Sequence, residues 1–406
     1  MTEHPAVSAA VVRGGTAYVV PDPVRAPLPH RALGTALPDP LAWHEPVPGF
    51  PVAGINRTET EFLHREVWAD NAYLRHGIAL PDGAVVVDAG ANIGMFSLFA
   101  AAHSPGATII AVEPLPEAAA AVAANAALHG ADVTVVAAAV GDRAGEAEFT
   151  FYPGNTVMSG RFADAAEDQA VLHAYLVTGD TGADLSGLVA DRMAPVVRRV
   201  PVTTLSAVIG ERTVDLLKLD VEKAEEEALA GIDDATWPRI RQIAVEVHDL
   251  DGRLRRTLDL LADKGFSTAH DQDPRLVDTP CHTVYGRRPD ARPGNGVTWA
   301  PPPDLAAELG VDRVVFVRSL DEVPEEQAGS RTPAAAVLAE VWAGLFGPDA
   351  VHPDADFFAL GGNSLTAVRL IAQVEDRLGE DVLAPDTVFT ATRLADLTAA
   401  LEDAVR

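Results

Sequence analysis

A serine near the end of the chain lies in a run of residues that suits covalent modification. Ser364 follows two glycines and an asparagine within the run 356–365 (DFFALGGNSL), and apolar residues at helical spacing begin directly after it. A serine is a good residue to begin a helix, and next to two glycines its hydroxyl is held out in solvent, where a modifying enzyme reaches it. The pattern predicts the attachment point of a swinging prosthetic arm that carries tethered cargo.

A second group of residues predicts a bound nucleoside. The run 86–96 (VVDAGANIGMF) ends a predicted strand; within it Gly90 lets the backbone turn tightly and Gly94 lets the next helix pack closely. The next strand, 108–113, ends in Glu113, and an acid there can accept hydrogen bonds from both hydroxyls of a ribose. These residues place the site at the carboxyl ends of two successive strands.

The spacing of the glycines indicates which nucleoside binds. It is G-x-x-x-G, whereas dinucleotide sites have G-x-G-x-x-G, and Asp88 precedes the first glycine. A carboxylate beside the loop repels a pyrophosphate and suits a ligand with cationic groups, and S-adenosylmethionine carries an ammonium and a sulfonium. Taken by themselves, the glycines could also mark an ordinary structural turn, which is the alternative interpretation. Together with Asp88 and Glu113 they predict S-adenosylmethionine as the cofactor.

Methyl transfer to oxygen needs alignment and a base. It is an in-line displacement on an electrophile that the cofactor already activates, so a base only removes the hydroxyl proton. His248, which closes the apolar run 242–248, is the candidate base, with Asp220 and Glu222 from the neighbouring strand as orienting or alternative bases. A solvated histidine on a loop is the alternative interpretation.

We expect this site to hold no metal. The twelve histidines include no H-x-H or H-E-x-x-H pattern. Asp220 and Glu222 could hold magnesium, but two acids two residues apart usually mark the edge of a strand.

The elements that must position these groups alternate along the chain. Apolar runs typical of strands occur at 84–88, 108–113, 133–138, 214–220 and 242–248, with helical patterns between them. Such alternation predicts an α/β fold with a mostly parallel sheet, helices on both faces and ligands at the carboxyl ends of the strands.

The C-terminal segment predicts a small four-helix bundle. One helix opens at Pro333 and is closed by Gly347-Pro348, a second follows Ser364, and the last runs over 394–404, while Phe357 and Phe358 anchor the long loop. From 332 to 406 the chain resembles a peptidyl carrier domain of nonribosomal peptide synthetases. The resemblance implies 4'-phosphopantetheine on Ser364, attached by a phosphopantetheinyl transferase; an ordinary capped helix is the alternative. This segment has twelve Asp or Glu against four Arg, a net charge of −8 that suits docking to basic patches on partner enzymes.

The central region resembles a methyltransferase family. The run 85–99, with Glu113-Pro114, Asn125, 140–142 and 217–222, is similar to FkbM-type S-adenosylmethionine-dependent methyltransferases, and 56–78 is similar to the segment that precedes this fold in members fused to synthetases. The resemblance implies a Rossmann-like, seven-stranded sheet. It also implies that Asp88, Gly90, Asn92 and Glu113 contact the cofactor and that Asp142 lies near the adenine. The family commonly has glycine where this chain has Lys223.

A polar, irregular insertion at 152–199, with a helix-like run at 167–176, interrupts the strand pattern. Long loops above a strand end tend to be lids, so we expect it to shape the acceptor pocket; an inert surface excursion is the alternative.

Short strands flank the methyltransferase. The runs 4–12, 16–20 and 314–318 resemble strands of the small C-terminal subdomain of an adenylation domain, which predicts that they pair into one sheet. The family's lysine-bearing P-x-x-x-G-K motif is absent from 319–331, so another enzyme should load Ser364; unrelated linker strands are the alternative. The expected divisions are an N-terminal segment (1–53), the methyltransferase (54–290), a linker with the remnant strand (291–331) and the carrier (332–406).

The composition of the chain limits the classes of partner that we expect it to bind. The 406 residues carry a formal charge of −28, which argues against a nucleic acid or an anionic membrane as partner. One cysteine permits no disulfide within the chain, and no basic and apolar leader or long apolar run is visible, so we expect a cytoplasmic protein.

These features predict a methyltransferase that acts, on oxygen, upon an acyl or aminoacyl group held by the arm on Ser364 in nonribosomal peptide or hybrid polyketide biosynthesis. One alternative is O- or N-methylation of a free or partner-borne molecule while the carrier serves separate chemistry. Another is a delivery module without catalysis, in which the glycine loop is a relic.

Overall fold

The structure is a computed structural model of the chain. It describes residues 4–13, 16–152, 156–162, 195–277, 279–294, 305–311, 313–323, 333–362, 364–378, 382–383, 387–388 and 391–404.

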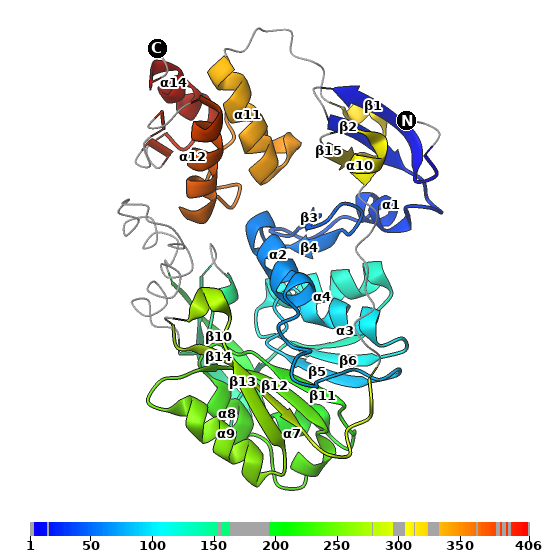
Figure 1. Cartoon of the computed structure of the whole chain (residues 1–406), viewed down its shortest axis with the longest axis vertical. Helices are drawn as coiled ribbons and strands as arrows, with labels where there is room; N and C mark the ends of the chain where they lie inside the picture. Colours follow the sequence, from blue (N-terminus) through cyan, green and yellow to red (C-terminus); the bar gives the residue numbers. More distant parts are fainter. Residues whose placement is uncertain are drawn as a thin grey trace.

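A seven-stranded sheet, in the order β13-β14-β12-β11-β5-β6-β7, forms the core of the lower half of the molecule as drawn in Figure 1. Its strands are β5 (Val85–Ala89), β6 (Thr108–Val112), β7 (Asp132–Val136), β11 (Leu216–Leu219), β12 (Gln242–His248), β13 (Ser267–Asp271) and β14 (Cys281–Arg287). Strands β12, β11, β5, β6 and β7 run parallel, and β14 is antiparallel to both β12 and β13. The predicted mostly parallel sheet and its five apolar strands are confirmed.

Helices cover both faces of this sheet because its central strands are apolar on both sides. Val86 packs into the core under α3 and α4, and Val87, the next residue, packs into the core under α7, α8 and α9. The helices are α3 (Met95–His103), α4 (Pro116–His129), α7 (Leu205–Ile209), α8 (Glu225–Ala230) and α9 (Arg253–Asp263). Single 3-10 turns occur at η3 (Trp237–Arg239) and η4 (Pro274–Leu276).

A layer formed by the chain before β5 packs on α3 and α4. It consists of the hairpin of β3 (Ala42–His44) and β4 (Val52–Gly54), then α2 (Arg57–His64) and a π-helical turn η1 (Arg65–Ala69). Phe50 and Trp68 from this layer join Phe99 of α3 in one aromatic cluster, with the ring centroids 5.2 Å apart at each contact. Through β4 and η1 the layer connects α2 to α4 and α3, which cover one face of the sheet.

A second small sheet, β8-β10-β9, follows β7. It contains β8 (Ala139–Val140), β9 (Gly145–Phe151) and β10 (Val196–Thr203), and η2 (Thr156–Met158) follows β9. The expectation of an irregular segment through residue 199 is wrong at its end, because 196–199 pair with 148–151. Residues 196–199 of β10 are exposed or partly exposed, so this half of the strand shows no pattern of alternating buried residues. The buried residues Val200 and Val202 lie in its other half. The predicted helix-like run at 167–176 lies outside the described residues.

The flanking strands pair as predicted. β1 (Val7–Arg13), β2 (Thr16–Pro21) and β15 (Arg313–Phe316) form one three-stranded sheet, in which β2 is antiparallel to β1 and parallel to β15. Leu305 of α10 (Leu305–Leu309) packs on Val7, Ala17 and Val19 of this sheet. The helix α1 (Pro27–Gly34) and the turn η5 (Leu320–Glu322) complete this part. In the sequence, the strands of the seven-stranded sheet are therefore inserted between β2 and β15 of this small sheet.

The C-terminal part is helical, as predicted. It contains α11 (Pro333–Phe346), η6 (Pro348–Ala350), α12 (Ser364–Leu378) and α14 (Leu394–Ala404). Trp342 and Phe357 are fully buried in its core, where their ring centroids lie 5.8 Å apart, so the expected anchoring of the long loop by Phe357 is confirmed. The rest of the predicted bundle falls in 379–390, most of which lies outside the described residues. This helical unit lies beside α2 (Figure 1).

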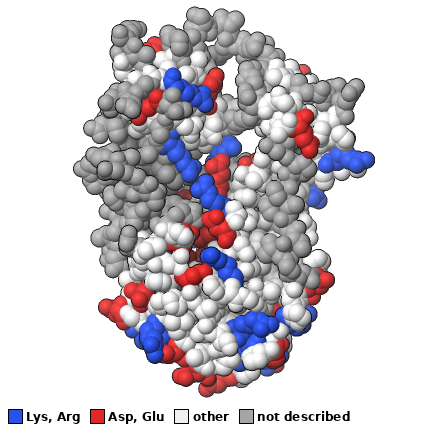
Figure 2. Space-filling view, viewed as in Figure 1, with Lys and Arg blue, Asp and Glu red and all other residues white. Residues whose placement is uncertain are grey.

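The described residues contain no helix that combines the length and the apolar character needed to cross a bilayer. On the face shown in Figure 2, the described Lys and Arg side chains are interspersed with Asp and Glu and form no continuous basic surface.

Candidate functional site

The glycine loop after β5 is held at the place predicted for the cofactor. Gly90 has φ 76°, and a Cβ atom there would overlap the carbonyl oxygen of Asp220, so only glycine fits. Gly94 has φ 82°, and a Cβ there would lie 3.2 Å from Val122 of α4, which explains how α3 and α4 pack closely. The two glycines therefore let the loop pack closely against the end of β11 and against α4, which fixes the backbone at the predicted nucleoside site.

Glu113 ties this loop to β6. Its carboxylate accepts hydrogen bonds from the backbone N–H of Asn92 (2.8 Å) and of Leu115 (2.9 Å). The side chain is buried, and burial raises its pKa to about 7 despite these two bonds. Each carboxylate oxygen can accept a further hydrogen bond, so the acid at the end of the second strand fits the ribose role predicted for it.

Asp88 lies beneath the loop. Its carboxylate is fully buried, accepts a hydrogen bond from the Ser97 hydroxyl (2.7 Å) and lies 3.3 Å from the Lys218 ammonium. Burial raises the pKa of Asp88, and the charge of Lys218 opposes that shift. We expected Asp88 to contact the cofactor; its surroundings instead support a role in fixing the loop from below.

Lys218, which the sequence reasoning missed, connects the parts of the site. Its ammonium on β11 donates to the Gly90 carbonyl (2.7 Å) and lies 3.4 Å from the Asp220 carboxylate. Burial alone would lower the pKa of Lys218, but the charges of Asp220 and Asp88 outweigh burial and raise it, so the residue stays charged. A lysine inside an apolar strand run was the signal that could have revealed it.

Asp142 follows β8 on the surface. It is exposed and lies 3.1 Å from the guanidinium of Arg143. Its proposed place near the adenine stays a prediction.

His248, Asp220 and Glu222 come together at one end of the sheet, as the sequence predicted. His248 is buried at the end of β12, and its Nε2 lies 3.5 Å from a Glu222 carboxylate oxygen. Carboxylate oxygens of Asp220, Glu222 and Glu246 all lie within 4.8 Å of one another. The Tyr73 hydroxyl donates to Asp220 (2.9 Å) and so fixes that carboxylate.

Neighbouring charges control protonation in this group. Burial disfavours the charged His248 ring, but its hydrogen bonds with Cys281 and Glu225 and the charge of Glu222 hold the pKa of His248 well above its usual value. The pKa of Glu246 is also raised well above its usual value, first by burial and then by the negative charges around it. The cluster therefore retains protons that isolated side chains would lose.

Cys281 and Glu225 also belong to this group, and the sequence reasoning did not name them as site residues. Cys281 pairs with His248 in the register of β14 against β12, and this return strand was not among the predicted strands. Glu225, which is fully buried, lies with its Oε1 2.8 Å from His248 Nδ1. Glu246 could have been found, because it stands two residues before His248 on the same face of a buried strand.

Lys223 shows why the family commonly has glycine at this position. Its φ is 68°, in the left-handed region that favours glycine, and Glu222 before it has φ 46°. The Lys223 N–H donates to the Glu225 carboxylate (3.0 Å), which holds this turn in place. The departure from the family pattern is therefore accommodated without loss of the turn.

Residues 156–160, which are the described part at the start of the expected lid, lie next to the site. The Thr156 hydroxyl donates to Glu59 of α2 (2.6 Å), and the Asn92 side-chain amide lies 3.5 Å from that hydroxyl. A Cβ at Gly160 would lie 2.9 Å from the Glu222 carbonyl oxygen. Residues 156–160 thus reach both the cofactor loop and the acidic end of β11.

The carrier motif lies against the same corner. Gly361 has φ 84°, and a Cβ there would lie 2.8 Å from Cβ of Asn56, the residue before α2. The Asn56 side-chain amide donates to Glu59 (2.7 Å), which in turn accepts from Thr156. A short chain of contacts therefore joins the loop before Ser364 to the cofactor loop.

Comparisons with known proteins agree with this description. The chain matches the family described as "Methyltransferase FkbM domain" over residues 88–268 and the one described as "Phosphopantetheine attachment site" over residues 336–401. The 31-O-demethyl-FK506 methyltransferase FkbM of Streptomyces tacrolimicus is 44% identical over 245 residues, which cover 59% of this chain and 94% of that protein. The AMB antimetabolite synthetase AmbE of Pseudomonas aeruginosa is 32% identical over 382 residues, which cover 79% of this chain but 18% of that protein.

Among solved structures, an FkbM methyltransferase from Methylobacillus flagellatus aligns with 15% identity and a TM-score of 0.32, covering 53% of this chain and 46% of that one.

Proposed function

This chain belongs to the FkbM family of S-adenosylmethionine-dependent methyltransferases and carries a phosphopantetheine attachment domain, and we propose that it methylates an oxygen of an acyl or aminoacyl group tethered to Ser364. The observation that supports the proposal is the contact of Gly361 with Asn56, from which hydrogen bonds through Glu59 and Thr156 lead toward Asn92 in the cofactor loop. An oxygen acceptor is supported by the relative from Streptomyces tacrolimicus, whose name states O-methylation.

The chain's own residues fit the cofactor. S-adenosylmethionine supplies an electrophilic methyl group. Gly90 and Gly94 let the loop lie close against β11 and α4, the Asn92 N–H ties the loop to Glu113, and Glu113 can accept from the ribose. Asp88 and Lys218 hold that loop from below. We propose Asp142 near the adenine.

We propose that His248, Asp220 and Glu222 act together on the acceptor: His248, whose pKa is held above its usual value, orients the acceptor hydroxyl, and Asp220 or Glu222 receives its proton. They lie at the carboxyl end of β11 and β12, next to the end of β5 that carries the cofactor loop. A carboxylate in this position removes the hydroxyl proton as the new bond to oxygen forms, so no free alkoxide develops. Gly160 packs against Glu222, so residues 156–160 line one side of this region.

Another protein loads the carrier in this proposal. The small sheet of β1, β2 and β15 agrees with a remnant of an adenylation subdomain, but the lysine-bearing motif is absent from 319–331. A phosphopantetheinyl transferase would attach the arm to Ser364, and a separate adenylating enzyme would supply the cargo. The similarity to AmbE and to enterobactin synthase component F of Escherichia coli, 38% identical over 85 residues, favours a synthetase of the nonribosomal peptide or hybrid polyketide kind.

The test compares two forms of one substrate. A hydroxy acid is offered either free or loaded on the arm of Ser364, with donor in excess, and the rate of methylation is measured by mass spectrometry. The proposal predicts much faster methylation of the loaded form. Equal rates would favour the alternative in which the methyltransferase acts on free molecules and the carrier serves separate chemistry.

A further inference from the structure

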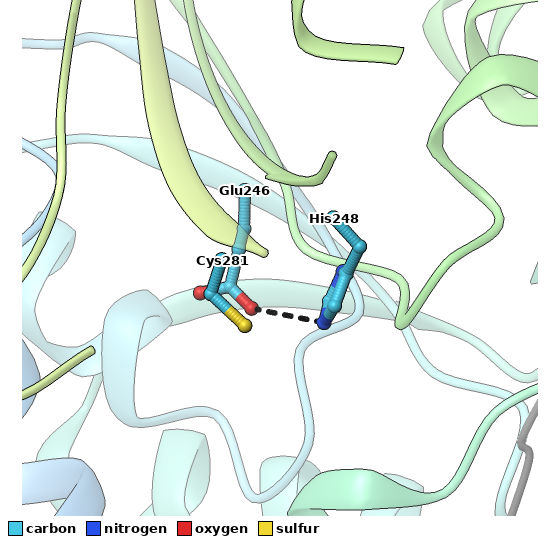
Figure 3. Close-up of side chains that lie close together, drawn as sticks. All are labelled: Glu246, His248 and Cys281. Carbon is cyan, nitrogen blue, oxygen red and sulfur yellow. Dashed lines mark ion pairs between the residues drawn. The ribbon is translucent and has the colours of Figure 1, made fainter. Parts of the chain in front are cut away.

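Three potential metal ligands of different chemical types lie together at the end of β12. The carboxylate of Glu246, a ring nitrogen of His248 and the thiol of Cys281 all lie within 4.8 Å of one another. Figure 3 shows the three side chains turned toward one another, from β12 and from the start of β14. His248 and Cys281 are buried, and Glu246 is partly buried.

The spacing of these atoms suits a tetrahedral ion. Metal–ligand distances of about 2.0 to 2.3 Å put neighbouring ligands in a tetrahedral zinc site about 3.3 to 3.6 Å apart. His248 Nε2 and Glu246 Oε1 lie 4.0 Å apart, so a shift of a few tenths of an ångström in each of these two side chains would bring them to ligand spacing, and the Cys281 thiol lies within 4.8 Å of both. A rotation of this size is within the freedom of a partly buried glutamate.

The histidine is already oriented as a ligand. Its Nδ1 lies 2.8 Å from Glu225 Oε1, which directs Nε2 toward Glu246 and Cys281. Glu225 is itself held by the Arg253 guanidinium (2.7 Å) and is fully buried. A buried carboxylate behind the histidine is the arrangement that fixes the tautomer of a metal-binding imidazole.

From this geometry we infer that Glu246, His248 and Cys281 bind a divalent ion of the zinc type. A mixed oxygen, nitrogen and sulfur set selects zinc or cobalt over magnesium, and three protein ligands leave a fourth position for an exogenous oxygen. Among the described residues no Lys or Arg forms an ion pair with Glu246, whereas Lys218 pairs with Asp220 and Arg253 with Glu225. The sequence-based expectation of a metal-free site did not include Cys281, which joins only through the register of β14.

The fourth position gives the ion a place in catalysis, and this part rests on the proposed function. Asp220 and Glu222 lie beside the trio, because their carboxylate oxygens are within 4.8 Å of that of Glu246. An acceptor hydroxyl bound at the open position would lose its proton more easily, and the proton would pass to Asp220 or Glu222. His248 would then act as a ligand, and the two carboxylates would keep the proton-accepting role.

Binding is tested with zinc and cobalt alone, on the full chain, without donor or acceptor. After dialysis against one equivalent of Zn²⁺, we expect one retained ion per chain by elemental analysis. With Co²⁺ we expect a near-ultraviolet thiolate-to-cobalt charge-transfer band that is lost in Cys281→Ser. Glu225→Gln should weaken zinc binding by about 10- to 100-fold, as loss of the group behind a metal-binding histidine does.

The control variant is His270→Ala, which removes an exposed histidine of the neighbouring strand β13 and should leave both readouts unchanged. Calorimetric binding of S-adenosylmethionine verifies that each variant is folded, since the cofactor loop is separate from the three ligands. A wild-type chain that retains no zinc, or a cobalt spectrum unaltered by Cys281→Ser, would overturn the inference. Neither result depends on methyl transfer, so the site and the proposed function can fail independently.

Discussion

Replacing Lys218 tests whether one buried cation holds the cofactor loop. The change Lys218→Met keeps the length of the side chain but removes the ammonium that lies 3.3 Å from Asp88 and 3.4 Å from Asp220 and donates to the Gly90 carbonyl. Asp88 is fully buried, so it would be left as an uncompensated charge or would have to take up a proton. Breaking a buried pair by removing one partner costs about 3–5 kcal/mol.

Denaturant unfolding at neutral pH measures this loss. We expect the free energy of unfolding of Lys218→Met to fall by about 3–5 kcal/mol, and the second change Asp88→Asn to recover part of the loss, because it removes the unpaired charge. Lys264→Met is the matched control: its partner Asp234 is 95% exposed, so the loss should stay below about 1 kcal/mol. A loss of under 1 kcal/mol for Lys218→Met, or a double variant no more stable than the single one, would refute the reasoning.

Three further changes test other parts of the site. Because the folded-state pKa of Glu113 is raised to about 7, its ionisation lowers stability as the pH rises from the ordinary glutamate pKa toward 7; Glu113→Gln should remove about 2.5 kcal/mol of the stability difference between pH 5 and pH 8, measured by denaturation at both. Gly90→Ala should lower the free energy of unfolding by about 2–5 kcal/mol and abolish calorimetric binding of the donor, whereas Gly106→Ala, with the same φ of 76° and open space around it, should cost only about 1–2 kcal/mol. Thr156→Val should cost about 1–3 kcal/mol, because Glu59 loses its hydroxyl donor, and Thr156→Ser should restore most of it; equal losses for the two variants would contradict this role of the hydroxyl.

The parts of the fold that could be read from the sequence are those fixed by local pattern. Parallel strands buried on both faces appear as continuous apolar runs, so β5, β6, β7, β11 and β12 were predicted close to their observed positions. Gly90 was identified by spacing, and its overlap with Asp220 shows the steric reason. The small sheet of β1, β2 and β15 was also predicted correctly, although the whole seven-stranded sheet separates β2 (Thr16–Pro21) from β15 (Arg313–Phe316) in the sequence.

The residues that were missed depend on pairing between distant elements. Cys281 reaches His248 only because β14 returns antiparallel beside β12, and a sequence run does not reveal that register. Lys218 was visible as a charge in an apolar strand, but its partners Asp88 and Gly90 come from another strand. Residues 196–199 of β10 were predicted to be irregular, because none of them is buried and so they show no alternation of buried and exposed side chains.

The central claim is that the arm on Ser364 delivers its cargo to the pocket of the same chain. Two variants, each lacking one function, test it. Ser364→Ala keeps the cofactor loop but has no attachment serine. Gly90→Val keeps the attachment serine but disrupts the cofactor loop. Intact mass after loading and incubation with the donor should show one added methyl on the wild-type carrier and little or none on an equimolar, dilute mixture of the two variants. A mixture that is methylated as fast as the wild type, or methylation of free acid by Ser364→Ala at the wild-type rate, would contradict it.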